Sequence, residues 1–285
     1  MAAGEQLSSG RYWDELHRGL GQARPYSAQA IDTYCSRQLL RIFDRFLQPQ
    51  PSRRLIEMGC ALSGYLPLFR QRYGYEVHGV DYSPVGCEAT VEGLRRSGLD
   101  LGGQIHCLDF LAPMPRLEGR FHCLVSFGVI EHFSTPAAVV RRFASLLAPD
   151  GIMITEIPNT ASPFFRLLKR LDRGLFDMHT RIDSAALADI HAEAGLDVLL
   201  CQYCGTLNYA VFKPRKLQHL TESLLWPTQN LLWRVSERLG FYPQSRLLSP
   251  YILCIARARA CPGITPGHAG LVEAKLPARN RDCEQ

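Results

Sequence analysis

The stretch Arg54–Phe69, RLIEMGCALSGYLPLF, joins a short apolar run to a set of small residues and then to apolar residues at helical spacing. The apolar run has the length of a buried strand, and Glu57 lies near its end. Small residues follow, as expected where a backbone approaches a ligand closely. A strand, a tight turn and a helix in this order predict the first unit of an α/β sheet with a ligand-binding turn.

The same alternation continues along the chain. Strands are expected at 54–58, 76–81, 104–108, 121–127, 151–157, 196–204 and 250–258. Helices are expected at 31–48, 64–73, 84–97, 135–147, 162–175 and 184–195. Alternating elements of these lengths predict parallel βαβ units with right-handed crossovers. The strands are apolar on both faces, which indicates a sheet covered by helices on both sides.

Composition and charge are those of an ordinary globular protein. The 285 residues are 46% hydrophobic and 21% charged, and the net charge is +5. The 32 Lys and Arg residues are spread along the chain, which favours a solvated surface, so we expect no nucleic-acid partner. No signal peptide and no run long enough to span a bilayer is recognisable, and we therefore expect a cytoplasmic location.

The cysteines indicate reduced thiols and no metal site. Several of the ten cysteines lie in apolar strand-like runs, where free cysteine behaves as a small hydrophobe. Cys201 and Cys204 form a C-x-x-C pattern. A zinc site of that type needs a second pair, which the sequence lacks, and we therefore expect no bound metal.

Polar and aromatic residues end four consecutive predicted strands. Glu57 ends the first strand, Asp81 the second, and Asp109 the third, with Phe110 directly after it. The fourth ends in SFGVIEHF, which contains His132. Because ligands of open α/β sheets bind at the carboxyl ends of the strands, these side chains should share one rim.

This rim has the chemistry of an adenosine site. Asp81 suits a ribose, because a carboxylate accepts hydrogen bonds from both hydroxyls. Asp109 could accept one from the adenine amine, and Phe110 or Tyr82 could lie against the ring. Glu57 precedes the first glycine and would repel a pyrophosphate. Opposite charges about 4 Å apart attract by about 4 kcal/mol at an effective dielectric constant of about 20, which favours the cationic S-adenosylmethionine over a dinucleotide.

Several segments resemble one enzyme family. They are LIEMGCALSGYL, VHGVDYSP, HCLDF, FHCLVSFGVIEHF and LLAPDGIMITEIPN, within residues 54–159, and MHTRIDSAALADIHAEAGLDV, which extends the likeness to about 198. With these motifs the chain is similar to class I S-adenosylmethionine-dependent methyltransferases, in particular to small-molecule enzymes such as those of ubiquinone biosynthesis. The resemblance implies a Rossmann-like αβα sandwich with a seven-stranded, mostly parallel sheet, whose last strand is antiparallel. It also implies S-adenosyl-L-methionine as cofactor and a small-molecule methyl acceptor.

The resemblance assigns a set of site residues. Asp81 would hold the ribose diol, Asp109 the adenine amine, and Phe127 with Gly128 the methyl-bearing side. The expected cofactor-binding residues are Glu57, Gly59, Ala61, Asp81, Tyr82, Asp109, Phe110 and Phe127.

Two other functions stay open at this point. Ala61 and Ser63 replace the second and third glycines of the family turn, acid-x-Gly-x-Gly-x-Gly, so a non-catalytic relative that binds S-adenosylmethionine is one alternative. The other is a nicotinamide-dependent oxidoreductase. Glu57 and the lack of a Tyr-x-x-x-Lys pair after the fourth strand count against it.

Two histidines are the candidate catalytic residues. Methyl transfer from a sulfonium depends mainly on alignment and on the exclusion of water. A hydroxyl acceptor would also gain from a base, and the imidazole of histidine can act as one near neutral pH. We expect methylation at oxygen, with His179 or His132 as the base. The alternative for each is a purely structural histidine.

The resemblance and the residue pattern together divide the chain into three parts. They are an N-terminal arm at 1–30, a methyltransferase domain at 31–260 and a disordered tail at 261–285. Leu and Trp residues recur at helical spacing in an insertion at about 212–248. We expect this insertion to form a helical lid over the pocket or a homodimer surface. The alternative is peripheral membrane contact through 214–241, with Lys213, Arg215 and Lys216 near lipid headgroups.

Overall fold

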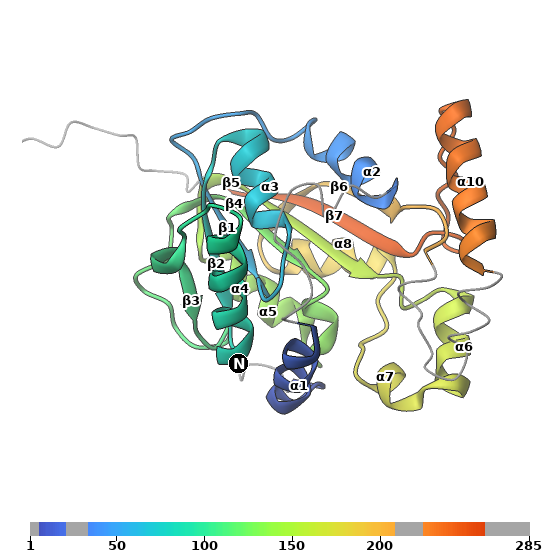
Figure 1. Cartoon of the computed structure of the whole chain (residues 1–285), viewed down its shortest axis with the longest axis horizontal. Helices are drawn as coiled ribbons and strands as arrows, with labels where there is room; N and C mark the ends of the chain where they lie inside the picture. Colours follow the sequence, from blue (N-terminus) through green and yellow to red (C-terminus); the bar gives the residue numbers. More distant parts are fainter. Residues whose placement is uncertain (1–5, 21–33, 209–224, 260–285) are drawn as a thin grey trace, which may run out of the picture.

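A seven-stranded sheet forms the centre of the computed structural model, which describes residues 6–20, 34–208 and 225–259 (Figure 1). The strand order is β3-β2-β1-β4-β5-β7-β6. The strands are β1 (Arg54–Met58), β2 (Glu76–Asp81), β3 (Ile105–Cys107), β4 (Phe121–Phe127), β5 (Leu147–Pro158), β6 (Leu196–Cys204) and β7 (Tyr251–Ala258). The pairs within β3-β2-β1-β4-β5 are parallel, whereas β7 is antiparallel to both β5 and β6. The predicted α/β fold with an antiparallel last strand is therefore confirmed.

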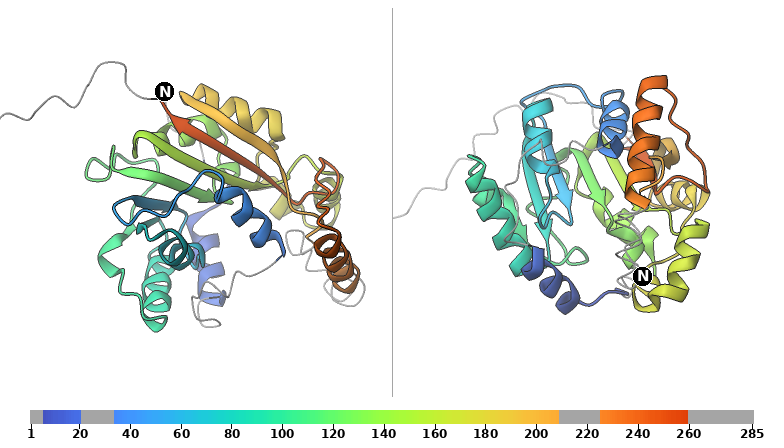
Figure 2. Two further views of the ribbon diagram at one scale, coloured as in Figure 1. Left: turned by 90° about the horizontal axis from the view of Figure 1, so that it is seen from above. Right: turned by 45° about the vertical axis from the view of Figure 1, so that its right-hand side comes forward.

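Helices cover both faces of the sheet (Figure 2). One face carries α2 (Tyr34–Phe43), α3 (Tyr65–Tyr73) and α4 (Pro84–Arg96), and the other carries α5 (Pro136–Ala144) and α8 (Ser184–Glu193). Neighbouring residues of β1, such as Leu55 and Ile56, point to opposite faces, and both are fully buried. This two-sided burial explains why the strands are apolar throughout.

Local sequence signals set several helix boundaries. Ser83 caps α4 by accepting a hydrogen bond from the Gly86 amide, and Pro84 occupies the first turn. Asp183 caps α8 in the same way through the Ala186 amide, as its position before the helix predicts. These caps fix where the helices leave the strand ends, and so they help to position the rim of the sheet.

Three predicted helices differ from the structure. The helix expected at 31–48 ends at Phe43, before a turn at 44–46. The helix expected at 135–147 ends at Ala144, because Leu147 already belongs to β5. The helix expected at 162–175 is split into α6 (Pro163–Leu171) and α7 (Arg173–Asp177). Asp172 interrupts it by accepting a hydrogen bond from the Leu175 amide at 3.1 Å, so the side chain caps a second helix and ends the first.

The helices α1 (Gly10–Leu20) and α10 (Trp226–Leu239) lie outside the sheet layers (Figure 1). Trp233 of α10 stacks on Tyr34 with ring centroids 5.0 Å apart. Leu231 and Leu239 of the predicted apolar face are 63% and 72% exposed, so these leucines do not pack over the described part of the domain. Among the described helices, none combines the length and the apolar character needed to cross a bilayer.

Parts of the predicted organisation lie outside the described residues. They are residues 1–5 and 21–30 of the arm, residues 31–33 of the helix expected at 31–48, residues 212–224 of the insertion with Lys213, Arg215 and Lys216, and the tail at 261–285. The proposed boundaries of the arm, the insertion and the tail remain predictions.

Candidate functional site

A pocket lies at the carboxyl ends of β1, β2 and β4. The strand order reverses between β1 and β4, and this is where open α/β sheets bind ligands. The pocket is open on one side, and its empty space together with the adjoining solvent is about 590 Å³. Its lining residues are Gln6, Ser8, Trp13, His17, Gly59, Ala61, Asp81, Tyr82, Phe110, Phe127, Gly128, Val129, His132 and Phe133.

The turn after β1 brings backbone close to this pocket. Gly59 has a φ of +80°, and a Cβ atom placed there would lie 2.5 Å from Cγ2 of Val129. Glycine is therefore required at 59 for both conformation and space. Ala61, by contrast, lies in the pocket lining and its amide donates a hydrogen bond to Oδ2 of Asp81 at 3.1 Å. The turn thus accommodates a residue with a side chain where the family pattern has its second glycine.

Asp81 joins the turn after β1 to the start of α4. Its Oδ2 accepts from Ala61, and its Oδ1 accepts from the Ser83 amide at 2.9 Å. Burial raises the pKa of Asp81, while these backbone donors oppose the rise. Each carboxylate oxygen has a second lone pair, so Asp81 can still accept hydrogen bonds from the hydroxyls of a ribose.

Three of the predicted aromatic contacts lie at the pocket. Tyr82 and Phe110 meet edge to face at 84°, with ring centroids 5.4 Å apart. Phe127 packs against Tyr65, with ring centroids 4.3 Å apart. Asp109 lies elsewhere: it is exposed, it is absent from the pocket lining, and its Oδ1 accepts from the Leu111 amide at 2.9 Å. Its predicted bond to adenine stays a prediction.

Glu57 lies beneath the turn and does not line the pocket. It is 1% exposed, and its Oε2 has no hydrogen-bond partner among the residues that the structure describes. Burial raises the pKa of Glu57 to about 8, against a smaller opposite effect of Ser63. In the free protein at pH 7 this carboxyl is therefore mainly neutral, and it becomes a carboxylate only when a cation or a higher pH favours the charged form.

The N-terminal segment supplies a wall of the pocket that the sequence did not reveal. Gln6 donates a hydrogen bond to the Tyr82 hydroxyl at 2.9 Å, and the Leu7 amide donates to the His132 carbonyl at 2.7 Å. Trp13 packs edge to face on His132, with ring centroids 5.1 Å apart. These contacts are long-range, so hydrophobic periodicity gives no sign of them. The aromatic pair at positions 12 and 13 was the only local signal.

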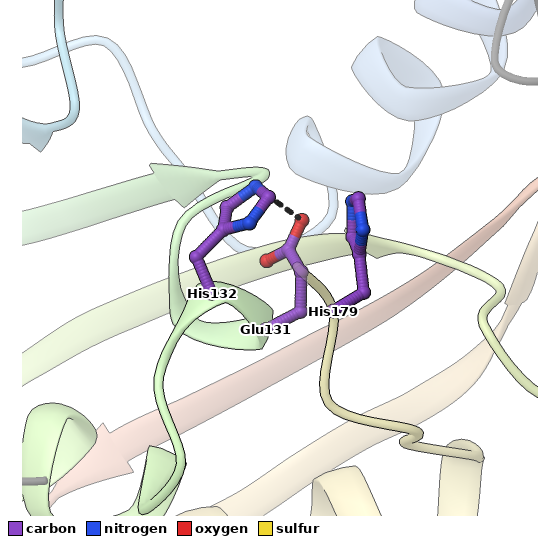
Figure 3. A group of neighbouring side chains, drawn as sticks. All are labelled: Glu131, His132 and His179. Carbon is purple, nitrogen blue, oxygen red and sulfur yellow. Dashed lines mark ion pairs between the residues drawn. The ribbon is translucent and has the colours of Figure 1, made fainter. Parts of the chain in front are cut away.

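The two candidate catalytic histidines lie near each other, beside Glu131 (Figure 3). Their ring centroids are 4.5 Å apart, and His132 lines the pocket. Nδ1 of His132 lies 2.9 Å from the Met178 carbonyl, and Nδ1 of His179 lies 2.7 Å from the Leu175 carbonyl. The pKa of His132 is lowered to about 4, mainly by burial and to a smaller extent by His179. Burial also lowers the pKa of His179. Both rings are therefore neutral at pH 7.

Glu131 completes this group and was not among the predicted site residues. It is fully buried, and in the described part of the chain neither carboxylate oxygen has a hydrogen-bond partner in another residue. Oε1 lies 3.9 Å from Nε2 of His132. The pKa of Glu131 is raised to about 8, mainly by burial and to a smaller extent by the nearby Glu156. Two neutral imidazoles beside one carboxyl group can accept a proton or hold a metal ion.

Comparisons with known proteins agree with this geometry. Residues 28–200 match the family model described as "Methyltransferase domain". The chain is 28% identical over 198 residues to a ubiquinone biosynthesis O-methyltransferase of Thiobacillus denitrificans. This match covers 66% of this chain and 78% of that protein. It is 30% identical over 112 residues to a tRNA U34 carboxymethyltransferase of Syntrophotalea carbinolica, but this match spans only 39% of the chain and 33% of the relative.

A solved structure has the same fold. Geranyl diphosphate C-methyltransferase from Streptomyces coelicolor A3(2), in a complex that includes S-adenosyl-L-homocysteine, superposes with a TM-score of 0.52 at 17% identity. The superposition covers 78% of this chain and 77% of that one. The matching family model spans more than half of the chain, and the sheet order and pocket position agree with the predicted family. The chain therefore belongs to the methyltransferase-domain family, among the class I S-adenosylmethionine-dependent methyltransferases.

Proposed function

We propose that this protein transfers a methyl group from S-adenosyl-L-methionine to a hydroxyl group of a small molecule. The observation that carries this proposal is the pocket at the ends of β1, β2 and β4, with Asp81 and two aromatic side chains at the adenosine end. The likeness to a ubiquinone biosynthesis O-methyltransferase supports oxygen as the acceptor atom.

The residues of the site divide the work of binding and reaction. Asp81 accepts hydrogen bonds from the ribose, while Tyr82 and Phe110 contact the adenine ring. The turn at Gly59 faces the methionine end, and Glu57 lies buried beneath that turn, where the cationic donor favours the charged form of Glu57. Phe127 and Gly128 hold the sulfonium side, and a neutral histidine at the end of the pocket accepts the hydroxyl proton.

The reaction balances without a further reactant. The acceptor oxygen forms a bond to the methyl carbon while the sulfur–methyl bond breaks, and that bonding pair stays on sulfur to give neutral S-adenosyl-L-homocysteine. The hydroxyl proton moves to the base or to solvent. Catalysis then depends on alignment of the reacting atoms and on the exclusion of water, to which the N-terminal wall with Trp13 contributes.

Calorimetry tests the binding part of this proposal. S-adenosyl-L-methionine should bind to the full chain, and NADH should not. Asp81→Asn should weaken the binding of the donor by about tenfold or more, because one charge-assisted acceptor is lost. Asp100→Asn changes an exposed acid away from the pocket and serves as a control. Unchanged affinity in Asp81→Asn, or preferential binding of NADH, would contradict the assignment.

Labelled donor tests the transfer part. Purified protein, cell extract and S-adenosyl-L-methionine with a labelled methyl group should yield a small-molecule product that carries the label and is 14 Da heavier than its precursor, plus any mass from the isotope. A chain that binds the donor but never produces S-adenosyl-L-homocysteine would be the non-catalytic relative.

A further inference from the structure

Glu131, His132 and His179 form a three-residue group, here called the Glu-His-His cluster (Figure 3). One ligand-type atom from each side chain lies within 4.8 Å of the other two. Glu131 and His132 come from a short 3-10 turn after β4, Ile130–His132, and His179 comes from the segment between α7 and α8. The Thr180 amide donates a hydrogen bond to the Glu131 carbonyl at 2.6 Å, so backbone contact holds the two segments together.

Both histidines of the cluster present the same free atom. A backbone carbonyl only accepts hydrogen bonds, so the bonds to Met178 and Leu175 place the ring proton of each histidine on Nδ1. The lone pair of each neutral ring is then on Nε2. Histidines that bind metals are commonly oriented this way, with the second ring nitrogen donating to a carbonyl or a carboxylate.

Glu131 lacks the partners that a buried carboxylate normally has. Its exposure is 0%, and neither of its oxygens makes a hydrogen bond to another of the described residues. The 3.9 Å distance to Nε2 of His132 is too long for a hydrogen bond, and within the described residues no Lys or Arg forms an ion pair with Glu131. Buried polar groups are almost always satisfied, so this carboxylate points to a group that binds between it and the two rings.

We propose that the Glu-His-His cluster binds one divalent transition-metal ion through the Glu131 carboxylate and the two Nε2 atoms. Two imidazoles and one carboxylate, without thiolate, suit Zn²⁺, Mn²⁺ or Fe²⁺ better than Ca²⁺ or Mg²⁺. Metal–ligand distances of about 2.0–2.2 Å require ligand atoms about 3–3.5 Å apart, so binding draws the three side chains slightly closer than they lie here.

The position of the cluster suggests how the metal takes part in the reaction, and this step rests on the proposed function. Three protein ligands leave a coordination position free, as in catalytic zinc sites. His132 lines the pocket, and Gly128 lies above Glu131, with a hypothetical Gly128 Cβ 3.6 Å from Oε1. A hydroxyl oxygen of the acceptor can occupy the free position, where the metal lowers the pKa of the hydroxyl and its proton leaves to solvent. With the metal bound, His132 and His179 orient the acceptor, and the metal replaces the histidine base of the proposed function.

Metal binding can be measured without any substrate. The full chain is dialysed against a chelator and then titrated with Co²⁺, as a spectroscopic substitute for Zn²⁺, and with Zn²⁺ and Mn²⁺. We expect one metal ion per chain, visible ligand-field bands with Co²⁺ and a higher Tm with the bound metal. Glu131→Gln and His179→Asn should each weaken metal binding by at least about 100-fold.

Glu156→Gln is the matched control. Glu156 is also a buried carboxylate with an oxygen that lacks a partner, but it does not belong to the cluster. This variant changes an ionisable neighbour of Glu131 but removes no metal ligand, so it should still bind one metal ion per chain. Circular dichroism checks that each variant is folded, and His179→Asn provides the test if Glu131→Gln does not fold, because His179 is only partly buried.

The outcomes separate the metal site from the methyltransferase activity. Sub-stoichiometric metal in the unchanged protein, or unchanged affinity in a folded His179→Asn or Glu131→Gln variant, would overturn the site. Methyl transfer that survives complete removal of the metal would retain the proposed function and reject the role of the metal in it. Stoichiometric metal in a protein that fails to bind S-adenosyl-L-methionine would retain the site and reject the proposed function.

Discussion

Replacement of Glu57 by glutamine should change how the stability of the free protein depends on pH. The folded-state pKa of Glu57 is about 8, whereas its ordinary value is 4.5. Between these values the folded state keeps a proton that the unfolded state has lost, so the free energy of unfolding falls as pH rises. Each pH unit contributes about 1.4 kcal/mol per group, and a rise from pH 5 to pH 7 therefore costs about 2.7 kcal/mol.

Glutamine keeps the shape of the side chain but cannot ionise. Glu57→Gln should therefore lose this contribution and be more stable than the unchanged protein at pH 7 by about 3 kcal/mol, with a much smaller difference at pH 5. A change in the contact with Ser63 alters the free energy of unfolding by the same amount at pH 5 and at pH 7. The informative quantity is therefore the slope of the free energy of unfolding against pH. Glu131 and Glu156 also have raised pKa values of about 8, so the variant should retain a part of the pH dependence.

Urea unfolding at several pH values measures the slope directly. Glu193→Gln, at an exposed position, is the control and should leave the slope unchanged. If Glu57→Gln shows the same slope between pH 5 and pH 7 as the unchanged protein, Glu57 is ionised in the folded state, and the explanation based on burial is wrong.

Three further predictions follow from the site and its supports. Gly59→Ala should lower the free energy of unfolding by about 1–3 kcal/mol, because the new Cβ would clash with Val129. Gly98→Ala should lower it by less, since Gly98 also has a positive φ but a Cβ there meets nothing within 4 Å among the described residues. Equal losses for the two variants in urea unfolding would exclude the clash. Trp233→Phe should destabilise the protein by about 1–2 kcal/mol. The phenyl ring can still stack on Tyr34, but the hydrogen bonds of the indole N–H to the Thr206 and Leu207 carbonyls are lost. A urea midpoint equal to that of the unchanged protein would contradict this. Binding of S-adenosyl-L-methionine at pH 7 should release close to one proton, measured by calorimetry in two buffers of different ionisation enthalpy, and the release should largely disappear in Glu57→Gln; identical enthalpies in both buffers would refute it.

The sequence predicted the sheet and much of its rim, because these depend on local patterns. Apolar runs identify strands covered on both sides, and Gly59, Asp81 and Phe110 follow those strands at fixed offsets. The turn, the acid at the end of β2 and the aromatic residue could thus be named in advance, and the structure gathers them in one pocket.

The remaining part of the site depends on contacts between distant segments. Nothing in the residues around Glu131 distinguishes a rim carboxylate from one beneath Gly128, and only the fold brings His179 beside it. The expectation of no metal site considered only Cys201 and Cys204, whereas the ligand-type group lies in three residues from two separate segments. Asp109 shows the opposite case, since its position after β3 fits the family pattern but its side chain is exposed.

The pairing of residues 6 and 7 with the strand-end segment at His132 makes the start of the chain a structural component of the binding site. Trimming this segment, or attaching a bulky tag to it, would alter a wall of the active centre and would not leave the catalytic domain intact. A preparation with a changed N-terminus could lose donor affinity although its core is fully folded. Activity measurements on this protein should therefore retain the segment that contains Gln6 and Leu7.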